Sequence, residues 1–291
     1  MQKVPRPLIV LHGDETLQAG LRAVASSQKL ELHFFNSWDE LDSGVPQTPA
    51  SALFVVDPWF ATDGTSGPSM ELASLLERFP SLTVTAATTV GPERVADLLL
   101  LASWGVVQII DLQEELTPLA LGRRLTAARG RPLRALVEGA LPEYTSASGR
   151  AILNAAFTIV ADGDQGSDLA RVLGITERTL SRWCRKAALP PPKRLLAWMR
   201  VLLAAEFLDD PGRPVAAVAQ ACGYSADSSL RLALRRFAGA NPTELRDMGA
   251  FDTAASAFVE ALSEARGSKR RYRAPSRQRL RSASYTSEAA D

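Results

Sequence analysis

Side chains that could bind a polyanion lie on two segments in the C-terminal third of this 291-residue chain. In each segment, arginine, serine and acidic residues occupy the side of a helical pattern that lies opposite its apolar residues. Arginine can bond bidentately to a phosphate or to the edge of a guanine, and short polar side chains can bond to either group. The candidate DNA-contacting residues are therefore Thr176, Glu177, Arg178, Ser181, Arg182 and Arg185 in the first segment, and Ser225, Asp227, Ser228, Arg231 and Arg235 in the second.

Each segment is preceded by the same short pattern, in which an alanine lies four residues before a glycine. The pattern reads DLARVLGIT over 168–176 and AVAQACGYS over 217–225, with Ala170 and Gly174 in the first copy and Ala219 and Gly223 in the second. A small residue lets two helices approach closely, and glycine tolerates the positive φ of a tight turn between them. The repeat predicts two helix-turn-helix units, whose second helices begin at the N-cap residues Thr176 and Ser225.

The apolar residues of the two second helices predict how those helices pack. In the first helix, Leu180 and Trp183 are expected to face the core. In the second helix, Leu230, Leu234 and Phe237 are expected to do so. The polar residues are then left on the outer surface, where the N-terminal half of a recognition helix reads base edges in the major groove.

A third helix is predicted between the two units. Apolar residues recur at helical spacing within PKRLLAWMRVLLAAEFLDDPG, after Pro192 and before the pair Pro211 and Gly212. At about 1.5 Å per residue such a helix is roughly 25 Å long. It could hold two recognition helices near the separation of about 34 Å between adjacent major grooves.

This arrangement resembles the AraC/XylS family of transcription regulators, whose DNA-binding module holds two such units joined by a helix. The resemblance covers roughly residues 146–247. The sequence departs from the family at Ser229 and Leu232, where an aromatic residue and an arginine are common. The matching positions are Ala170, Gly174, Thr176, Arg178, Leu180 and Arg182; Pro192, Leu196, Arg200, Ala204 and Leu208; and Ala219, Cys222, Gly223, Tyr224, Ser225, Ser228, Leu230, Gly239 and Pro242. The resemblance implies a sequence-specific DNA-binding transcription regulator.

The first 116 residues alternate short apolar, β-rich runs with helical patterns. That alternation is typical of a parallel sheet covered by helices, so the predicted fold is a doubly wound α/β domain followed by an all-α domain. Asp57 ends one apolar run and Thr85-Ala86 end another, which is similar to the phosphoacceptor strand and the signalling strand of a response-regulator receiver (flavodoxin-like) domain.

The acidic pair and the lysine that phosphoryl transfer to Asp57 would need have no counterpart at the expected places. The first strand ends in Leu11-His12-Gly13-Asp14, and Asp111 stands where a lysine is expected. We therefore expect a degenerate receiver-like domain that serves regulation, protein contact or dimerisation. Asp57 remains the candidate phosphoacceptor, and the alternative is a carboxylate that caps the turn after its strand.

Charge divides along the chain in the same way as the predicted domains. Residues 1–116 hold 6 Lys and Arg against 15 Asp and Glu, whereas residues 146–249 hold 14 against 10. An acidic N-terminal region and a basic C-terminal region suit a regulatory module joined to a nucleic-acid-binding domain. The predicted divisions are a receiver-like domain at 1–116, a helical linker at 117–145, the DNA-binding domain at 146–249, and a C-terminal helix with a basic, disordered tail at 250–291, with the tail beginning near residue 267.

Composition limits the other possibilities. Cys184 and Cys222 are too few for a disulfide framework or a metal site, and no apolar run is long enough to span a membrane. We expect a cytoplasmic protein that is not an enzyme and carries no cofactor or metal. Double-stranded DNA is the predicted partner, with RNA polymerase and a second copy of the chain, bound through the N-terminal domain, as further candidates. The alternatives are a protein-interaction adaptor and a phosphorylatable response regulator with a weak DNA-binding half.

Overall fold

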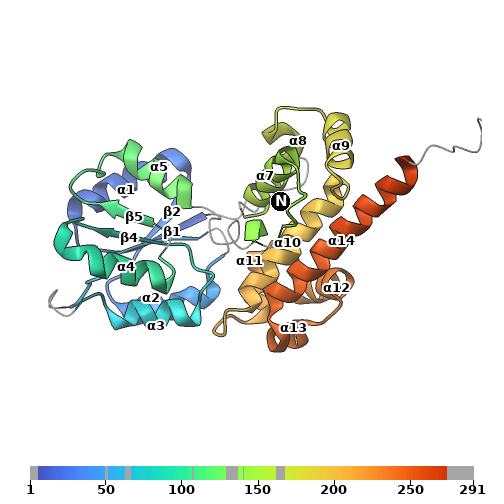
Figure 1. Ribbon diagram of the computed structural model, residues 1–291. Coiled ribbons are helices and arrows are strands. Elements are labelled where there is room, and N and C mark those ends of the chain that lie inside the picture. The colour runs from blue at the N-terminus through green and yellow to red at the C-terminus, as the bar shows by residue number, and fades with distance from the viewer. Residues whose placement is uncertain are drawn as a thin grey trace, which may run out of the picture.

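The structure, a computed structural model, describes residues 6–49, 52–62, 67–106, 108–128, 137–139, 141–161 and 168–273. Figure 1 shows an α/β domain followed by a helical domain. The predicted tail beyond residue 273 lies outside the described residues. In the described part of the chain, no helix is both long and apolar enough to cross a membrane.

The N-terminal domain is built on a single five-stranded sheet. Its strands are parallel and lie in the order β2-β1-β3-β4-β5. That order is the one found in flavodoxin-like folds, so the predicted fold class is confirmed. The strands are β1 (Arg6–Leu11), β2 (Leu30–Phe34), β3 (Leu53–Val56), β4 (Val84–Thr88) and β5 (Gln108–Asp111).

Helices cover both faces of the sheet, because the side chains of its strands alternate between two apolar clusters. The helices α1 (Glu15–Gln28) and α5 (Pro118–Ala128) lie on one face. The helices α2 (Trp38–Gly44), α3 (Met70–Arg78) and α4 (Val95–Trp104) lie on the other, with short 3-10 turns at Val45–Gln47 and Pro92–Arg94.

Helix α5 packs on the α/β domain, although the sequence places its residues in the linker. Leu121 and Leu125 of α5 are buried in one cluster with Leu17 and Leu21 of α1. The two helices approach so closely that a Cβ at Gly20 would lie 2.6 Å from Leu121. The α/β domain therefore extends past the predicted boundary at residue 116. The amphipathic pattern of this segment predicts a helix but does not say which surface the helix covers.

The C-terminal domain is entirely helical in its described residues. Its helices are α7 (Ala147–Ala161), α8 (Asp168–Val172), α9 (Glu177–Lys186), α10 (Pro192–Leu208), α11 (Val215–Ala221), α12 (Asp227–Ala238), α13 (Pro242–Met248) and α14 (Ala250–Arg273). Helix α10 contacts α7, α9, α11, α12, α13 and α14. This central position explains why most side chains of α10 between Leu195 and Leu208 are buried.

Helix α14 lies along α10 and completes the core. Phe258 and Leu262 are buried, and the ring of Phe258 lies 5.4 Å from the ring of Trp198 in α10. The carboxylate of Asp209 accepts hydrogen bonds from the first two amides of the helix, at 2.7 and 2.8 Å. The helix continues to Arg273, beyond residue 267, where the sequence predicts the tail to begin.

The two domains meet through the loop between α10 and α11. Asp210 accepts a hydrogen bond from the amide of Ser81 at 3.0 Å and also bonds to its hydroxyl. Arg213 donates to Asp210 at 3.0 Å and to the carbonyl oxygen of Thr48 at 2.8 Å. Thr48 and Ser81 precede β3 and β4, so the helical domain joins the amino edge of the sheet. The side chains of Asp210 and Arg213 are both buried in this junction.

Candidate nucleic-acid interface

The first helix-turn-helix unit consists of α8, a turn and α9. Gly174 adopts a φ of +64°, and the amide of Ile175 bonds back to the carbonyl oxygen of Ala170 at 2.9 Å. The hydroxyl of Thr176 accepts a hydrogen bond from the amide of Thr179 at 3.2 Å, which makes Thr176 the N-cap of α9. The turn and the cap therefore follow the chemistry that the sequence predicts here.

Leu180 and Cys184 form the buried face of α9. The prediction that Trp183 faces the core with Leu180 is wrong, because Trp183 is 38% exposed whereas Cys184 is fully buried. A spacing of four residues, rather than three, sets the packed side of this short helix. Burial raises the pKa of the Cys184 thiol to about 11, so this thiol is a packing group.

The predicted contact residues of the first unit all face outward. Within the described residues, the guanidinium groups of Arg178, Arg182 and Arg185 have no carboxylate partner, so each remains available to a phosphate or a base. The exposed set comprises Thr176, Glu177, Arg178, Ser181, Arg182 and Arg185.

The second unit consists of α11, a turn and α12. Gly223 adopts a φ of +74°, and the amide of Tyr224 bonds to the carbonyl oxygen of Ala219 at 2.9 Å. The prediction that Ser225 is the N-cap is wrong. Ala226 is the N-cap, without a side-chain hydrogen bond, and the hydroxyl of Ser225 lies 3.3 Å from that of Ser229. The turn after the glycine is one residue longer here than in the first unit.

Leu230 and Leu234 anchor α12 in the core as predicted, whereas Phe237 is half-buried with its ring 5.0 Å from that of Trp198. Asp227 and Arg231 form an exposed ion pair at 3.7 Å. The predicted contact residues of this unit are exposed in the structure: Ser225, Asp227, Ser228, Arg231 and Arg235.

The caps and the buried anchors place the two recognition helices in register. Ala226 corresponds to Thr176, and the buried pair Leu230 and Leu234 corresponds to Leu180 and Cys184. Arg178 then corresponds to Ser228, Arg185 to Arg235, and Arg182 to Leu232. Leu232 is 70% exposed on the same side of α12 as the polar candidates. Leu232 was absent from the predicted contacts, and its apolar type at an outward position was the signal that could have identified it.

Helix α10 connects the two units. It contacts both α9 and α12, and Figure 1 shows these two helices near opposite ends of α10. A buried helix is a rigid connection, so the relative placement of the two recognition helices is set by the core of the domain.

The comparison with known families agrees with this geometry. Residues 169–248 match a family described as "Helix-turn-helix domain". These residues form an AraC-type helix-turn-helix domain. No curated protein matches the chain.

Solved structures similar to the chain include response regulators. RcsB from Salmonella enterica serovar Typhimurium, bound to promoter rprA, is 17% identical with a TM-score of 0.34, and the match covers 66% of this chain and 98% of RcsB. Full-length FixJ from B. japonicum is 15% identical with a TM-score of 0.31, over 65% of this chain and 95% of FixJ. The receiver-like assignment of the N-terminal domain rests on its own strand order.

The carboxyl edge of the sheet, opposite the junction with the AraC-type domain, carries the predicted phosphoacceptor. Oδ1 of Asp57 accepts a hydrogen bond from the amide of Trp59 at 2.9 Å, so this carboxylate caps the turn after β3. His12 is buried after β1, with its Nε2 atom 3.1 Å from the carbonyl oxygen of Ala87. Asp111 ends β5 and accepts from the amide of Gln113 at 3.0 Å.

The predicted signalling position needs correction. Strand β4 continues to Thr88, so Thr85 and Ala86 lie inside the strand and not at its end. Thr88 is paired with Asp111 in the register of β4 and β5, and it holds the position at the carboxyl edge. The two threonines on either side of the alanine pair make the end of this strand ambiguous in the sequence.

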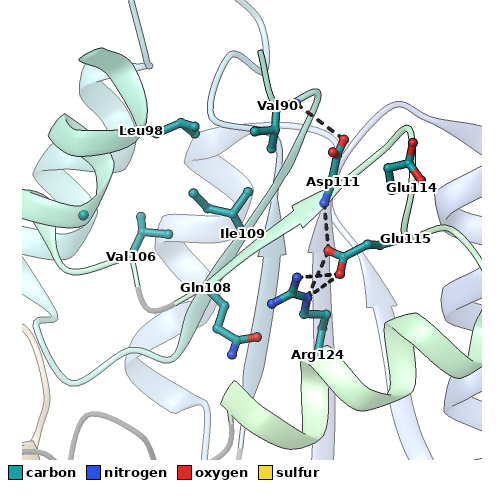
Figure 2. Close-up of a pocket in the computed structure, with 10 residues that line it drawn as sticks. Val90, Leu98, Val106, Gln108, Ile109, Asp111, Glu114, Glu115 and Arg124 are labelled. Atoms are coloured by element: carbon teal, nitrogen blue, oxygen red, sulfur yellow. Dashed lines mark hydrogen bonds and ion pairs between the residues drawn. The ribbon is translucent and has the colours of Figure 1, made fainter. Parts of the chain in front are cut away.

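A groove of about 630 Å³ lies between α4, β5 and α5. Figure 2 shows Leu98, Val106 and Ile109 on one side and the polar group of Glu115 and Arg124 on the other. The hydrogen bond from Arg124, at 2.7 Å, lowers the pKa of Glu115. Next to the groove, α4 exposes a row of apolar side chains to solvent: Val95, Leu99 and Leu100.

Proposed function

We propose that the protein is a transcription regulator that binds duplex DNA sequence-specifically, with α9 and α12 in successive major grooves. The observation that carries this proposal is the division of both helices into a buried apolar face and an exposed polar face at matching positions. Arginines on these faces would bond to phosphates and to guanine edges, while the hydroxyl residues near each N-terminus would bond to bases or phosphates. RNA polymerase remains a predicted partner.

Substitution of Arg182 by alanine tests the base-reading role. We expect affinity for a selected binding site to fall about 10-fold or more, while affinity for random duplex changes much less, since one good base contact is worth about 1–3 kcal/mol. The measurement is a fluorescence-anisotropy titration at several salt concentrations with the full chain. Arg123→Ala, an exposed arginine on α5, is the matched control. Equal losses on both duplexes would contradict base reading by Arg182.

We propose that the N-terminal domain supplies a dimer contact through the groove and the exposed row on α4. The apolar row contains Val95 and Leu99, the latter 68% exposed, and it lies directly beside an apolar groove wall on the same molecule. A second copy can meet both features through one two-fold contact, because such a contact pairs the same patch on each copy. Leu99→Asp is expected to convert a dimer to a monomer in light scattering. A monomeric wild-type chain would refute the proposal.

We also propose that this receiver-like domain acts by contact and not by phosphoryl transfer. Asp57 is engaged as a turn cap, and the strand end at Asp111 is acidic, which opposes the build-up of phosphoryl charge at this edge. Incubation of the full chain with acetyl phosphate and Mg²⁺ tests the proposal by mass spectrometry. We expect no mass gain, and a phosphoryl adduct on Asp57 would contradict it.

A further inference from the structure

The side chain of Leu232 projects into solvent from a surface that is otherwise polar. It is 70% exposed, as much as any other large apolar side chain in the described residues. Single exposed apolar residues are common on protein surfaces and need no explanation by themselves. The position of Leu232 on a recognition helix distinguishes it from exposed leucines elsewhere, such as Leu119 on α5, which is 67% exposed.

Leu232 belongs to the face of α12 that holds the candidate DNA contacts. Ser228 precedes it by four residues and Arg235 follows it by three, so all three lie on one side of the helix. Ser228, Arg231, Leu232 and Arg235 form one wall of a groove of about 550 Å³, whose other wall comes from α13 and the residue before it. An apolar group therefore sits among side chains that would face base edges and phosphates.

We propose that Leu232 contacts the C5-methyl group of a thymine in the major groove, and that the two recognition helices read unlike half-sites. This inference rests on the DNA-binding function proposed above. The thymine methyl is the apolar group that the major groove presents, and apolar side chains recognise it by contact. At the matching position of α9, Arg182 would instead bond to guanine O6 and N7.

The chemistry of the two helices thus predicts an asymmetric binding site. The half-site under α9 contains a guanine opposite Arg182, and the half-site under α12 contains a thymine opposite Leu232. Because the contact with Leu232 involves one methyl group, the loss of that methyl is expected to weaken binding about fourfold. A duplex with uracil in place of that thymine keeps every hydrogen-bonding group and lacks the methyl alone.

The test uses the full chain and a site selected from random duplexes. Hydroxyl-radical footprints of the wild type and of Arg235→Ala locate the half-site under α12. Each thymine in that half-site is then replaced singly by uracil, and affinities are measured for the wild type, for Leu232→Ala and for the matched control Leu119→Ala. We expect one uracil to weaken binding by the wild type and by Leu119→Ala about fourfold, and to have no effect on Leu232→Ala.

Three results would overturn the inference. The first is tight, specific binding by the wild type that no uracil substitution weakens. The second is a half-site under α12 that contains no thymine. The third is a Leu232→Ala variant whose binding is still weakened by the uracil substitution. A chain that selects no duplex would overturn the proposed function together with this inference, so the two failures can be told apart. As a positive check, Leu232→Arg is expected to shift the preferred base at the same position from thymine to guanine.

Discussion

The two recognition helices have buried anchors at matching positions, but they begin differently. Helix α9 has a hydroxyl N-cap at Thr176, whereas α12 begins at Ala226 without a side-chain cap. Around the second unit, Arg246 of α13 donates to the carbonyl oxygens of Leu208, at 3.0 Å, and of Arg213. The start of α9 is therefore fixed by a local cap, whereas the residues that flank the second unit are joined by contacts distant in sequence.

The second unit is also connected to the N-terminal domain. Arg213 and Asp210 lie directly before α11, the first helix of the second unit, and they bond to Thr48 and Ser81 of the α/β domain. The amino edge of the sheet is therefore bonded directly to the residues at the start of the second unit. A unit with a local helix cap and a unit that depends on the domain junction should respond differently to substitution.

The largest effect is expected from Asp210→Ala. The change leaves the guanidinium of Arg213 buried beside Phe207 and Phe79 without its carboxylate, and removal of one partner of a buried ion pair typically costs about 3–5 kcal/mol. Urea unfolding of the full chain measures the free energy of unfolding. Asp247→Ala, at an exposed aspartate of α13, is the control. A loss below about 1 kcal/mol for Asp210→Ala, the range of exposed pairs, would show that the junction contributes little.

A pH-dependent effect is expected at Glu206, on the last turn of α10 near the same junction. Burial raises the pKa of this carboxyl well above its ordinary value of 4.5, and the carboxylates of Asp210 and Asp209 raise it further, against the opposing charge of Arg213. Since the pKa in the folded state is the higher one, the protonated group stabilises the fold at low pH. That stability is lost as the pH rises from about 4.5 through the raised pKa, by about 1.4 kcal/mol per unit of difference.

Glu206→Gln tests this assignment because glutamine keeps the shape and carries no charge. We expect the variant to have the higher melting temperature at pH 8, with the difference shrinking as the pH falls towards 4.5. Scanning calorimetry across this pH range checks the trend. A wild-type advantage at pH 8 would mean that the ionised carboxylate is stabilised in the fold, contrary to its burial.

The junction shows where the sequence stops being informative. The parallel sheet and both helix-turn-helix units follow from local patterns, since β-rich runs alternate with helical ones and the glycines fix the turns. The pairing of Ser81 with Asp210 joins residues 129 positions apart, and no local pattern marks either partner. Trp183 and Cys184 differ by one position on a short helix, so periodicity alone could not decide which of them is buried. The later start of α12 likewise depends on a turn that is longer by one residue.

A smaller effect is expected from Thr176→Ala in the first unit. Loss of an N-cap hydroxyl costs about 1 kcal/mol, and the amide of Thr179 then loses its partner. We expect faster hydrogen exchange at the first amides of α9, with the amides of α12 unchanged. Thr176→Ser, which keeps the hydroxyl, should exchange like the wild type. An equal increase in both helices would show that the two units do not open independently.

The smallest effect is expected from Ala226→Ser in the second unit. Ala226 has the extended backbone of an N-cap, with φ −159° and ψ 160°, so a serine hydroxyl at this position can reach the amide of Ser229. That amide already bonds to the carbonyl oxygen of Ala226 at 3.1 Å, and the gain should therefore be roughly 0.5 kcal/mol, below the loss at Thr176. Urea unfolding and hydrogen exchange of α12 measure it. A gain in stability equal to the loss caused by Thr176→Ala would mean that the contacts of Arg246 and the domain junction do not compensate for the missing cap of α12. The two units would then differ in their caps alone.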